Sequence, residues 1–315
     1  MIIMTLIVML ASALITTTVL EMWLRLGACL PIDVANSRSL HAGSVPRIGG
    51  MAMGLGIGFA LQLTPSHTVP AVPVLAATGL LLLSFVDDWC SLPIFPRLLG
   101  HLLAAGVVVA ALHLPLWPSI LAVFAIVWAT NLYNFMDGAD GLAGGMTAIG
   151  FGAYALAAWP VSPEIFWISI PIAGAAMGFL IFNFPPAKVF MGDAGSIPVG
   201  FLAGALGLIG WRNEIWPFWF PALVFSPFLV DATATVLRRL LSKQKVWQAH
   251  REHYYQRLVL MNWSHRRLAL LAWGLMITAA GSALWLKSLD ESLHWPILMA
   301  WVVVYGYLLR TIGRI

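Results

Sequence analysis

The sequence predicts an all-α, polytopic membrane protein: one helical bundle of about ten or eleven transmembrane spans, in a single domain covering residues 1–315. Apolar residues make up 60% of the chain and charged residues only 10%. Because a soluble fold carries about 25% charged residues, this composition excludes a water-facing surface. The 15 Trp, 28 Gly and 19 Pro also agree with a membrane protein, where aromatic residues gather at the interfaces and Gly and Pro are tolerated.

Eleven apolar segments are candidates for spans, each of which needs roughly 17–25 residues. The first, residues 2–22, is too long for the apolar part of a signal peptide and lacks a basic start and a small-residue cleavage site, so we expect it to span. The others centre near 49–64, 71–86, 98–114, 117–134, 142–159, 165–182, 197–211, 216–237, 267–287 and 294–310.

The basic residues predict how the bundle is oriented. When the first loop is placed in the cytoplasm, only Arg212 and Lys287 of the 17 Lys and Arg residues fall on the other side. Such an asymmetry is the positive-inside signal of a multi-pass protein. The predicted cytoplasmic loops lie at about 25–48, 87–97, 134–142, 183–196 and 238–266. We expect the lipid bilayer, and no nucleic acid, as the surrounding partner.

Five aspartates are predicted to share the cytoplasmic membrane face: Asp87, Asp88, Asp137, Asp140 and Asp193. An acid at a helix end can simply reflect nearby water, but carboxylates set against apolar helices are costly and usually functional. Five carboxylates on one face would repel one another without a cation. Oxygen ligands without cysteine favour a hard ion, and Mg²⁺ binds through one or two carboxylates plus substrate phosphates. The sequence therefore predicts a Mg²⁺ site, with Mn²⁺ as the alternative.

Two segments bring amide and basic side chains to these acids. In NLYNFMDGADGLAGG, residues 131–145, polar side chains recur every third residue at Asn131, Asn134, Asp137 and Asp140, and glycines open the backbone to a ligand. A plain glycine turn would not require these side chains.

The second segment, FNFPPAKVFMGDAGS, contains Asn183, Lys188 and Asp193. Its GDAGS run precedes a helix, whose first N–H groups could bind an anion. Lys188 is either a phosphate-binding charge or a lysine that snorkels to the interface.

The large hydrophilic loop RRLLSKQKVWQAHREHYYQRL contributes His250, His253 and Arg257. Two histidines without a third ligand make a weak zinc site. A phosphate-binding role for these residues and an ordinary solvated, positive-inside loop remain equally open.

These motifs, in order and spacing, resemble those of the polyprenyl-phosphate N-acetylhexosamine-1-phosphate transferases, of the glycosyltransferase family 4 type. They are SVPRIGG (44–50), FVDDWCSLP (85–93), NLYNFMDGADGLAGG, NFPPAKVFMGDAGS and the loop at 250–257. The loop lacks the consecutive histidines and the acid of the phospho-MurNAc-pentapeptide translocase. It is more similar to the loop of enzymes that initiate O-antigen and exopolysaccharide synthesis. The resemblance implies a bundle of ten or eleven spans with its active site at the cytoplasmic face.

The resemblance also implies an activity: transfer of a sugar-1-phosphate from a UDP-sugar to undecaprenyl or another polyprenyl phosphate, with release of UMP, to initiate O-antigen or another cell-envelope polysaccharide. It implies the bacterial inner membrane as the location, and a homodimer is left open. Asp193 matches the Mg²⁺-binding aspartate and Phe190 the residue that stacks on uracil. The expected catalytic residues are Asp87, Asp88, Asp137 and Asp140. The expected substrate-binding residues are Arg47, Asn131, Asn134, Asn183, Lys188, Phe190, His250, His253 and Arg257.

Three other functions share parts of this pattern. A phospho-MurNAc-pentapeptide translocase of peptidoglycan synthesis is the nearest alternative. A secondary transporter is less suitable, because its site is expected near the bilayer midplane whereas these acids lie at one interface. A non-catalytic lipid-binding protein is not excluded by composition, although every acidic motif residue is present.

Overall fold

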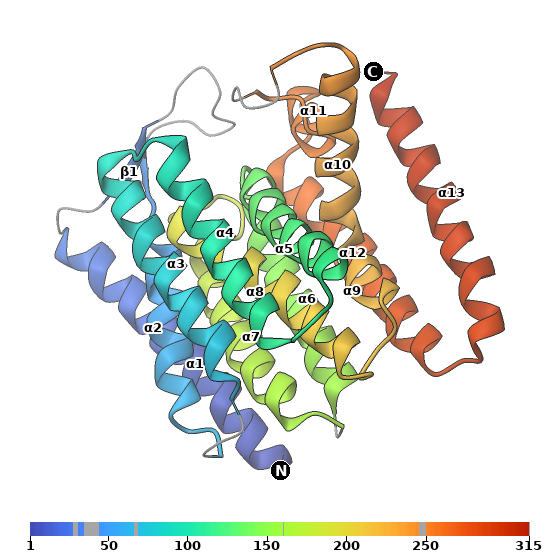
Figure 1. Cartoon of the computed structure of the whole chain (residues 1–315). Coiled ribbons are helices and arrows are strands. Elements are labelled where there is room, and N and C mark those ends of the chain that lie inside the picture. The colour runs from blue at the N-terminus through green and yellow to red at the C-terminus, as the bar shows by residue number, and fades with distance from the viewer. Residues whose placement is uncertain (28–30, 35–43, 66–68, 160, 246–249, 315) are drawn as a thin grey trace.

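The computed structural model describes residues 1–27, 31–34, 44–65, 69–159, 161–245 and 250–314. Parts of the predicted cytoplasmic loops 25–48 and 238–266 lie outside these ranges. In Figure 1 the N-terminus lies at the lower end of the bundle, whereas the C-terminus lies at the upper end with β1 and α11.

The fold is a helical bundle whose first eight helices are α1 (Ile2–Leu26), α2 (Gly49–Leu61), α3 (Ala71–Cys90), α4 (Ile94–Ala111), α5 (Leu116–Phe135), α6 (Leu142–Ala158), α7 (Pro163–Asn183) and α8 (Asp193–Arg212). After them come α9 (Trp219–Val224), α10 (Ser226–Leu241), α11 (Tyr254–Leu260), α12 (His265–Lys287), a short 3₁₀ turn η1 (Glu291–Leu293) and α13 (His294–Gly313). This confirms the predicted polytopic membrane bundle.

Each of the eleven predicted segments coincides with helix, but they are not equally long. Within the described ranges, eight helices are long and apolar enough to cross a membrane: α1, α3, α4, α5, α7, α8, α12 and η1 with α13. Helices α2 and α6 are apolar but shorter, with 13 and 17 residues. The segment at 216–237 is broken at Phe225 into α9 and α10, because prolines at 217, 221 and 227 interrupt the backbone ladder. Length and apolarity alone thus support eight spans, fewer than the sequence predicted.

One further element departs from the all-α expectation. Strands β1 (Ile32–Val34) and β2 (Ser44–Pro46) form a two-stranded antiparallel ribbon in which Asp33 pairs with Val45. The ribbon lies in a segment predicted as loop, and three residues per strand are too few to give a readable alternation. It lies between α1 and α2 in the chain, at the upper end of the bundle in Figure 1.

Helices α6, α7 and α8 form the interior of the bundle. Most of the residues of α7 and α8 are buried. Helix α7 packs against α1, α2 and α6, whereas α8 packs against α3 and α5. By contrast, α13 stands at one edge in Figure 1, with only His294 and Tyr305 buried along it. The central position of α8 brings its first residue, Asp193, among the ends of the surrounding helices.

Candidate active site

The acid pair lies in the last turn of α3, where the negative end of the helix dipole makes a carboxylate unfavourable. Asp87 is 7% exposed, and the protein compensates its charge directly. Its Oδ1 accepts a hydrogen bond from the Leu92 N–H at 2.6 Å, and its Oδ2 lies 3.1 Å from Nη1 of Arg97. The predicted loop 87–97 is therefore a tight connection between α3 and α4 in which the acids are helical.

Arg97 joins α3 to α8. It lies in the first turn of α4, and its Nη2 is 3.2 Å from Oδ2 of Asp193 while Nη1 holds Asp87. One guanidinium thus bridges two carboxylates from different helices, and its own side chain stays 35% exposed. The sequence predicts for Arg97 only that it is one of the Lys and Arg residues on the cytoplasmic side.

The second acid of the pair, Asp88, caps the start of α8. Its two oxygens accept hydrogen bonds from the N–H groups of Ala194 at 3.1 Å and Asp193 at 3.4 Å. A helix N-terminus favours an anion, as the sequence predicted for the GDAGS run, and here a carboxylate of the same chain takes that place. Gly192, which precedes the helix, has a φ of 71°, a left-handed conformation that a residue with a side chain rarely adopts.

The segment SVPRIGG packs against the residues just before α8 through backbone hydrogen bonds. Phe190 N–H donates to the Pro46 carbonyl at 2.9 Å, and the N–H groups of Gly49 and Gly50 donate to Phe190 at 2.9 Å and Met191 at 2.7 Å. These bonds fix Phe190 and the start of α8 relative to β2 and α2. Arg47, within the same segment, pairs with Asp33 of β1 at 2.7 Å.

Asp137 completes the group from the turn between α5 and α6. Burial raises the pKa of this carboxyl well above its ordinary value, and the neighbouring charge of Asp193 raises it further. The Arg47 guanidinium and the Gly192 N–H, which donates to the carboxylate, act in the opposite direction. We call Asp87, Asp88, Asp137 and Asp193 the acidic cluster; Arg47 and Arg97 are the cations beside it.

Asp140, the fifth predicted acid, lies outside this cluster. Its Oδ1 is 3.1 Å from Nδ1 of His265, the first residue of α12, and its Oδ2 accepts from the Ala187 N–H at 3.0 Å. Asp140 therefore connects the Asp137 turn with the Pro-rich segment and with α12. His265 was not singled out from the sequence, because a lone histidine 125 residues away in sequence carries no pattern.

Some of the asparagine side chains predicted to bind the substrate make hydrogen bonds within the protein. Asn183 is 3% exposed; its Oδ1 accepts from the Gly141 N–H at 2.9 Å and its Nδ2 donates to the Val189 carbonyl at 2.9 Å. These two bonds join the two motif segments, and a direct contact of Asn183 with the substrate stays a prediction. Asn131 donates to the Val127 carbonyl one turn back and contacts His101. Asn134 is partly exposed on the last turn of α5, and Lys188 is exposed.

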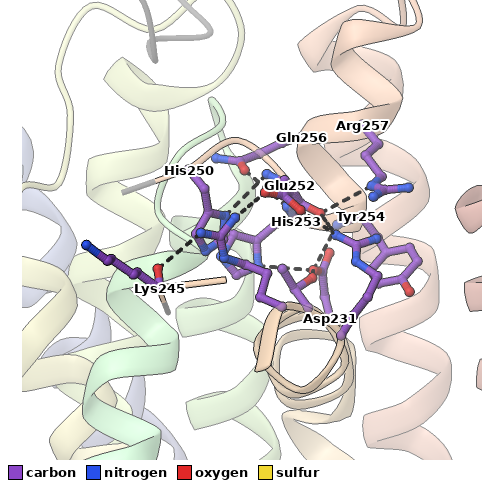
Figure 2. Close-up of polar contacts among 11 residues, drawn as sticks. Asp231, Lys245, His250, Glu252, His253, Tyr254, Gln256 and Arg257 are labelled. Atoms are coloured by element: carbon purple, nitrogen blue, oxygen red, sulfur yellow. Dashed lines mark hydrogen bonds and ion pairs between the residues drawn. The ribbon is translucent and has the colours of Figure 1, made fainter. Parts of the chain in front are cut away.

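The last loop forms a compact polar network around Asp231 of α10 (Figure 2). The Asp231 carboxylate accepts from the N–H groups of Tyr254 and Tyr255, both at 2.9 Å, and contacts Nδ1 of His253 at 3.3 Å. His253 is 3% exposed and also caps α11, so it stabilises the folded loop, and its contact with the substrate stays a prediction.

The two other predicted loop residues are more accessible. His250 stacks on His253 with ring centroids 5.0 Å apart, and burial followed by the proximity of His253 lowers its pKa to about 4. Arg257 is partly buried, donates to the Glu252 carbonyl at 3.3 Å and lies over the Tyr254 ring.

Glu252 ties the loop to α10 by pairing with Arg238 and Arg239. Tyr255 carries the network onward, since its hydroxyl donates to the Phe135 carbonyl at 3.1 Å beside Gly138.

The acidic cluster supplies the hard oxygen donors that a divalent cation prefers. Among the described residues, no three His, Cys, Asp or Glu side chains are arranged as a complete ligand set. Mg²⁺ does not require one, because it commonly keeps several waters and uses one or two carboxylates together with substrate phosphates. Asp193, with Asp137 and Asp88 as its charged neighbours, fits such an incomplete set.

Comparison with known proteins places these elements in a family. Residues 71–210, which run from the start of α3 to the last turn of α8 and include the whole acidic cluster, match the family model of glycosyl transferase family 4. A Bacillus subtilis protein named "probable undecaprenyl-phosphate N-acetylglucosaminyl 1-phosphate transferase" is 29% identical over 300 residues, which are 89% of this chain and 83% of the relative.

Two further relatives differ in how much they share. A decaprenyl-phosphate N-acetylglucosaminephosphotransferase of Mycolicibacterium smegmatis is 30% identical over 301 residues, covering 79% of this chain and 72% of the relative. A phospho-N-acetylmuramoyl-pentapeptide-transferase of Bacillus pumilus is 35% identical, but over only 51% of this chain and 50% of its own. The chain therefore belongs to glycosyl transferase family 4, which confirms the predicted family and the prediction of a membrane enzyme of the phospho-N-acetylhexosamine transferase type.

Proposed function

We propose that this protein transfers N-acetylglucosamine-1-phosphate, or a closely related N-acetylhexosamine-1-phosphate, from a UDP-sugar to undecaprenyl or another polyprenyl phosphate, and releases UMP. The observation that carries this proposal is the acidic cluster with Arg47 and Arg97 at one end of a membrane bundle, where a water-soluble nucleotide and a membrane-bound acceptor can meet. The names of the relatives that align over most of the chain support the same donor and acceptor.

The reaction requires one phosphate to attack another, so its transition state carries charge on phosphoryl oxygens. Catalysis of such steps depends mainly on positioning and electrostatic stabilisation. A phosphate monoester has a second pKa near 6, so the acceptor is already mostly dianionic at neutral pH and needs no strong base. Asp87 and Asp88 suit an aligning role, because hydrogen bonds and an ion pair already fix their oxygens.

Asp193 is the residue we assign to Mg²⁺, with Mn²⁺ as a substitute and with Asp137 beside it. When bound, the cation supplies neutralisation of the donor diphosphate and of the departing UMP. Phe190 is held next to Asp193 by the β2 and α2 backbone and suits stacking on uracil. Asp140 and the backbone around it suit hydrogen bonds to the base.

The wider biological role follows from the same reading. We place the active site at the cytoplasmic face of the bacterial inner membrane and the product at the start of O-antigen or another cell-envelope polysaccharide. A pentapeptide-bearing donor is the alternative within the family. The last loop favours a simpler sugar, because its AHREHYYQRL run lacks the consecutive histidines and the acid of the pentapeptide enzyme.

A direct assay tests the proposal. The purified protein is incubated in detergent with undecaprenyl phosphate, Mg²⁺ and a panel of UDP-sugars, and lipid products are identified by mass. We expect a polyprenyl-diphosphate-sugar from UDP-GlcNAc, dependent on Mg²⁺, together with exchange of labelled UMP into the donor. Lipid binding without any product from the whole panel would favour a non-catalytic lipid-binding protein. A product from UDP-MurNAc-pentapeptide alone would favour the peptidoglycan enzyme.

A further inference from the structure

The proposed reaction presents the acidic cluster with an electrostatic difficulty. The acceptor phosphate carries nearly two negative charges at neutral pH and must approach carboxylates at 87, 88 and 193. The phosphate and the carboxylates repel one another, and this repulsion is stronger beside the low-dielectric bilayer than in water. A cation that belongs to the acceptor side of the site is therefore needed in addition to one that neutralises the donor diphosphate.

Two arginines of the described chain lie beside the cluster, and their surroundings differ. Arg47 is on the segment after β2, pairs with Asp33 at 2.7 Å and acts on Asp88 and Asp137. Its neighbours on that segment hold Phe190, so Arg47 belongs to the donor side. Arg97 is on a membrane-spanning helix instead.

Arg97 lies among apolar side chains that are exposed on the outside of the bundle. Ile94 and Phe95, which precede it in the first turn of α4, are 65% and 74% exposed, and Leu98 and Leu99 after it are both 42% exposed. Exposed apolar side chains of this kind on a span contact acyl chains. Arg97 is therefore located where the bilayer meets the acidic cluster, which is the side from which a polyprenyl chain must arrive.

The guanidinium of Arg97 is held in one orientation and still has N–H donors that can bind a ligand. A guanidinium has five N–H donors, and the two ion pairs, Nη1 to Asp87 and Nη2 to Asp193, leave others available. The side chain is 35% exposed, so a ligand can reach it. Asp87, which is buried and also bonded to the Leu92 N–H, holds the group in one direction.

We propose that Arg97 binds the phosphate of the polyprenyl acceptor and directs it to the donor, with Asp87 as the residue that positions the guanidinium. This inference rests on the proposed function. Arginine suits the task because its planar donors engage a phosphate bidentately and keep their charge near a membrane. A cation occupying Asp193 would take over part of that carboxylate's charge and leave Arg97 more available to the acceptor.

The test compares lipids that differ only in the phosphate. Binding of undecaprenyl phosphate and of the neutral undecaprenol to the detergent-solubilised full chain is measured by native mass spectrometry, without donor or Mg²⁺. Wild type and Arg97→Lys are expected to prefer the phosphate, and Arg97→Gln to lose roughly 10- to 100-fold of that preference, as removal of a charge-assisted hydrogen bond implies. Arg25→Gln is the control, since Arg25 is 77% exposed on α1 and pairs with Glu21 one helical turn away.

Steady-state kinetics provides the second readout. Arg97→Gln should raise KM for the lipid phosphate at least about tenfold and raise KM for the UDP-sugar much less. An unchanged phosphate preference in a folded Arg97→Gln protein, or an equal rise in both KM values, overturns the assignment. If Arg97→Gln does not fold, Arg97→Lys takes its place. An Arg97→Lys enzyme with the wild-type ratio of the two KM values supports the assignment of Arg97 to the acceptor. An Arg97→Lys enzyme whose KM rises for the UDP-sugar alone overturns that assignment. An absence of product from wild type, with phosphate preference intact, refutes the proposed function and leaves the Arg97 site standing.

Discussion

Gly50 is the position where a single methyl group should disable the enzyme from outside the acidic cluster. A Cβ at this residue would lie 2.1 Å from the N atom and 2.3 Å from the Cα of Gly195. Both are backbone atoms of α8, so no flexible side chain can move aside. To reach even 3.0 Å, the closest distance that real Cβ atoms show, α2 and the start of α8 must separate by about 0.9 Å. Overpacking of this size costs roughly 1–3 kcal/mol of stability.

The same shift moves Asp193, two residues before Gly195, relative to Asp88. Because a misplacement of about 1 Å can cost roughly 100-fold in rate, we expect Gly50→Ala to lower kcat about 100-fold while the protein still folds. Release of UMP at saturating donor, lipid and Mg²⁺ measures kcat, and the thermal midpoint in detergent measures stability.

Gly58→Ala is the matched control for this experiment. Gly58 lies on the same helix with nothing within 4 Å of an added Cβ, so alanine there should keep full activity and stabilise α2 by about 0.5–1 kcal/mol. If Gly50→Ala is as active as Gly58→Ala, the α2–α8 contact does not set the geometry of the site and the reasoning fails.

Three other outcomes are expected. Asp193→Asn should lower turnover at least about 100-fold without loss of folding, as removal of one charged ligand from an incomplete set implies; near-native activity at saturating Mg²⁺ would remove Asp193 from the metal site. His265→Ala should weaken UMP inhibition roughly tenfold by removing the ring that orients the Asp140 carboxylate, and an unchanged inhibition constant would contradict this link. Folding lowers the pKa of His250 from 6.5 to about 4. Between these pH values the unfolded chain binds a proton at His250 and the folded chain does not, so the folded state loses stability as the pH falls. The thermal midpoint of wild type should therefore fall between pH 6.5 and 4 more steeply than that of His250→Asn, and parallel curves would argue against a buried neutral His250.

The fold was largely predictable because membrane spans are read from composition and length alone. Apolar segments predicted the helices of the bundle except α11, which lies in the large hydrophilic loop, but hydropathy does not show where prolines divide a segment, so α9 and α10 were expected as one span. The ribbon of β1 and β2 escaped notice because its strands have three residues each and are fixed by contacts with distant chain. Periodicity carries no information about such short pairings.

The candidate site was predictable to the extent that its residues sit in motifs. The acids at 87, 88, 137 and 193 come together as expected from their shared membrane face. The sequence did not reveal the internal hydrogen bonds of Asn183 and His253, because the partner of a polar side chain depends on the packing of other helices. Arg97 had a usable signal, namely a basic residue directly after the second of the two prolines that follow the acid pair.

The ion pair of Asp87 and Arg97 also bears on how the protein is made. Both residues belong to one hairpin of consecutive spans, α3 and α4, so the pair can form as soon as these two helices have left the translocon. A paired acid and base enter a bilayer at far lower cost than either charge alone. Asp88 receives the charge of Arg47, which lies earlier in the chain, but its two backbone donors begin only 105 residues later. A nascent chain that stops before α8 is therefore expected to hold a carboxylate at the membrane surface without its donors, and its insertion is completed only when the start of α8 arrives.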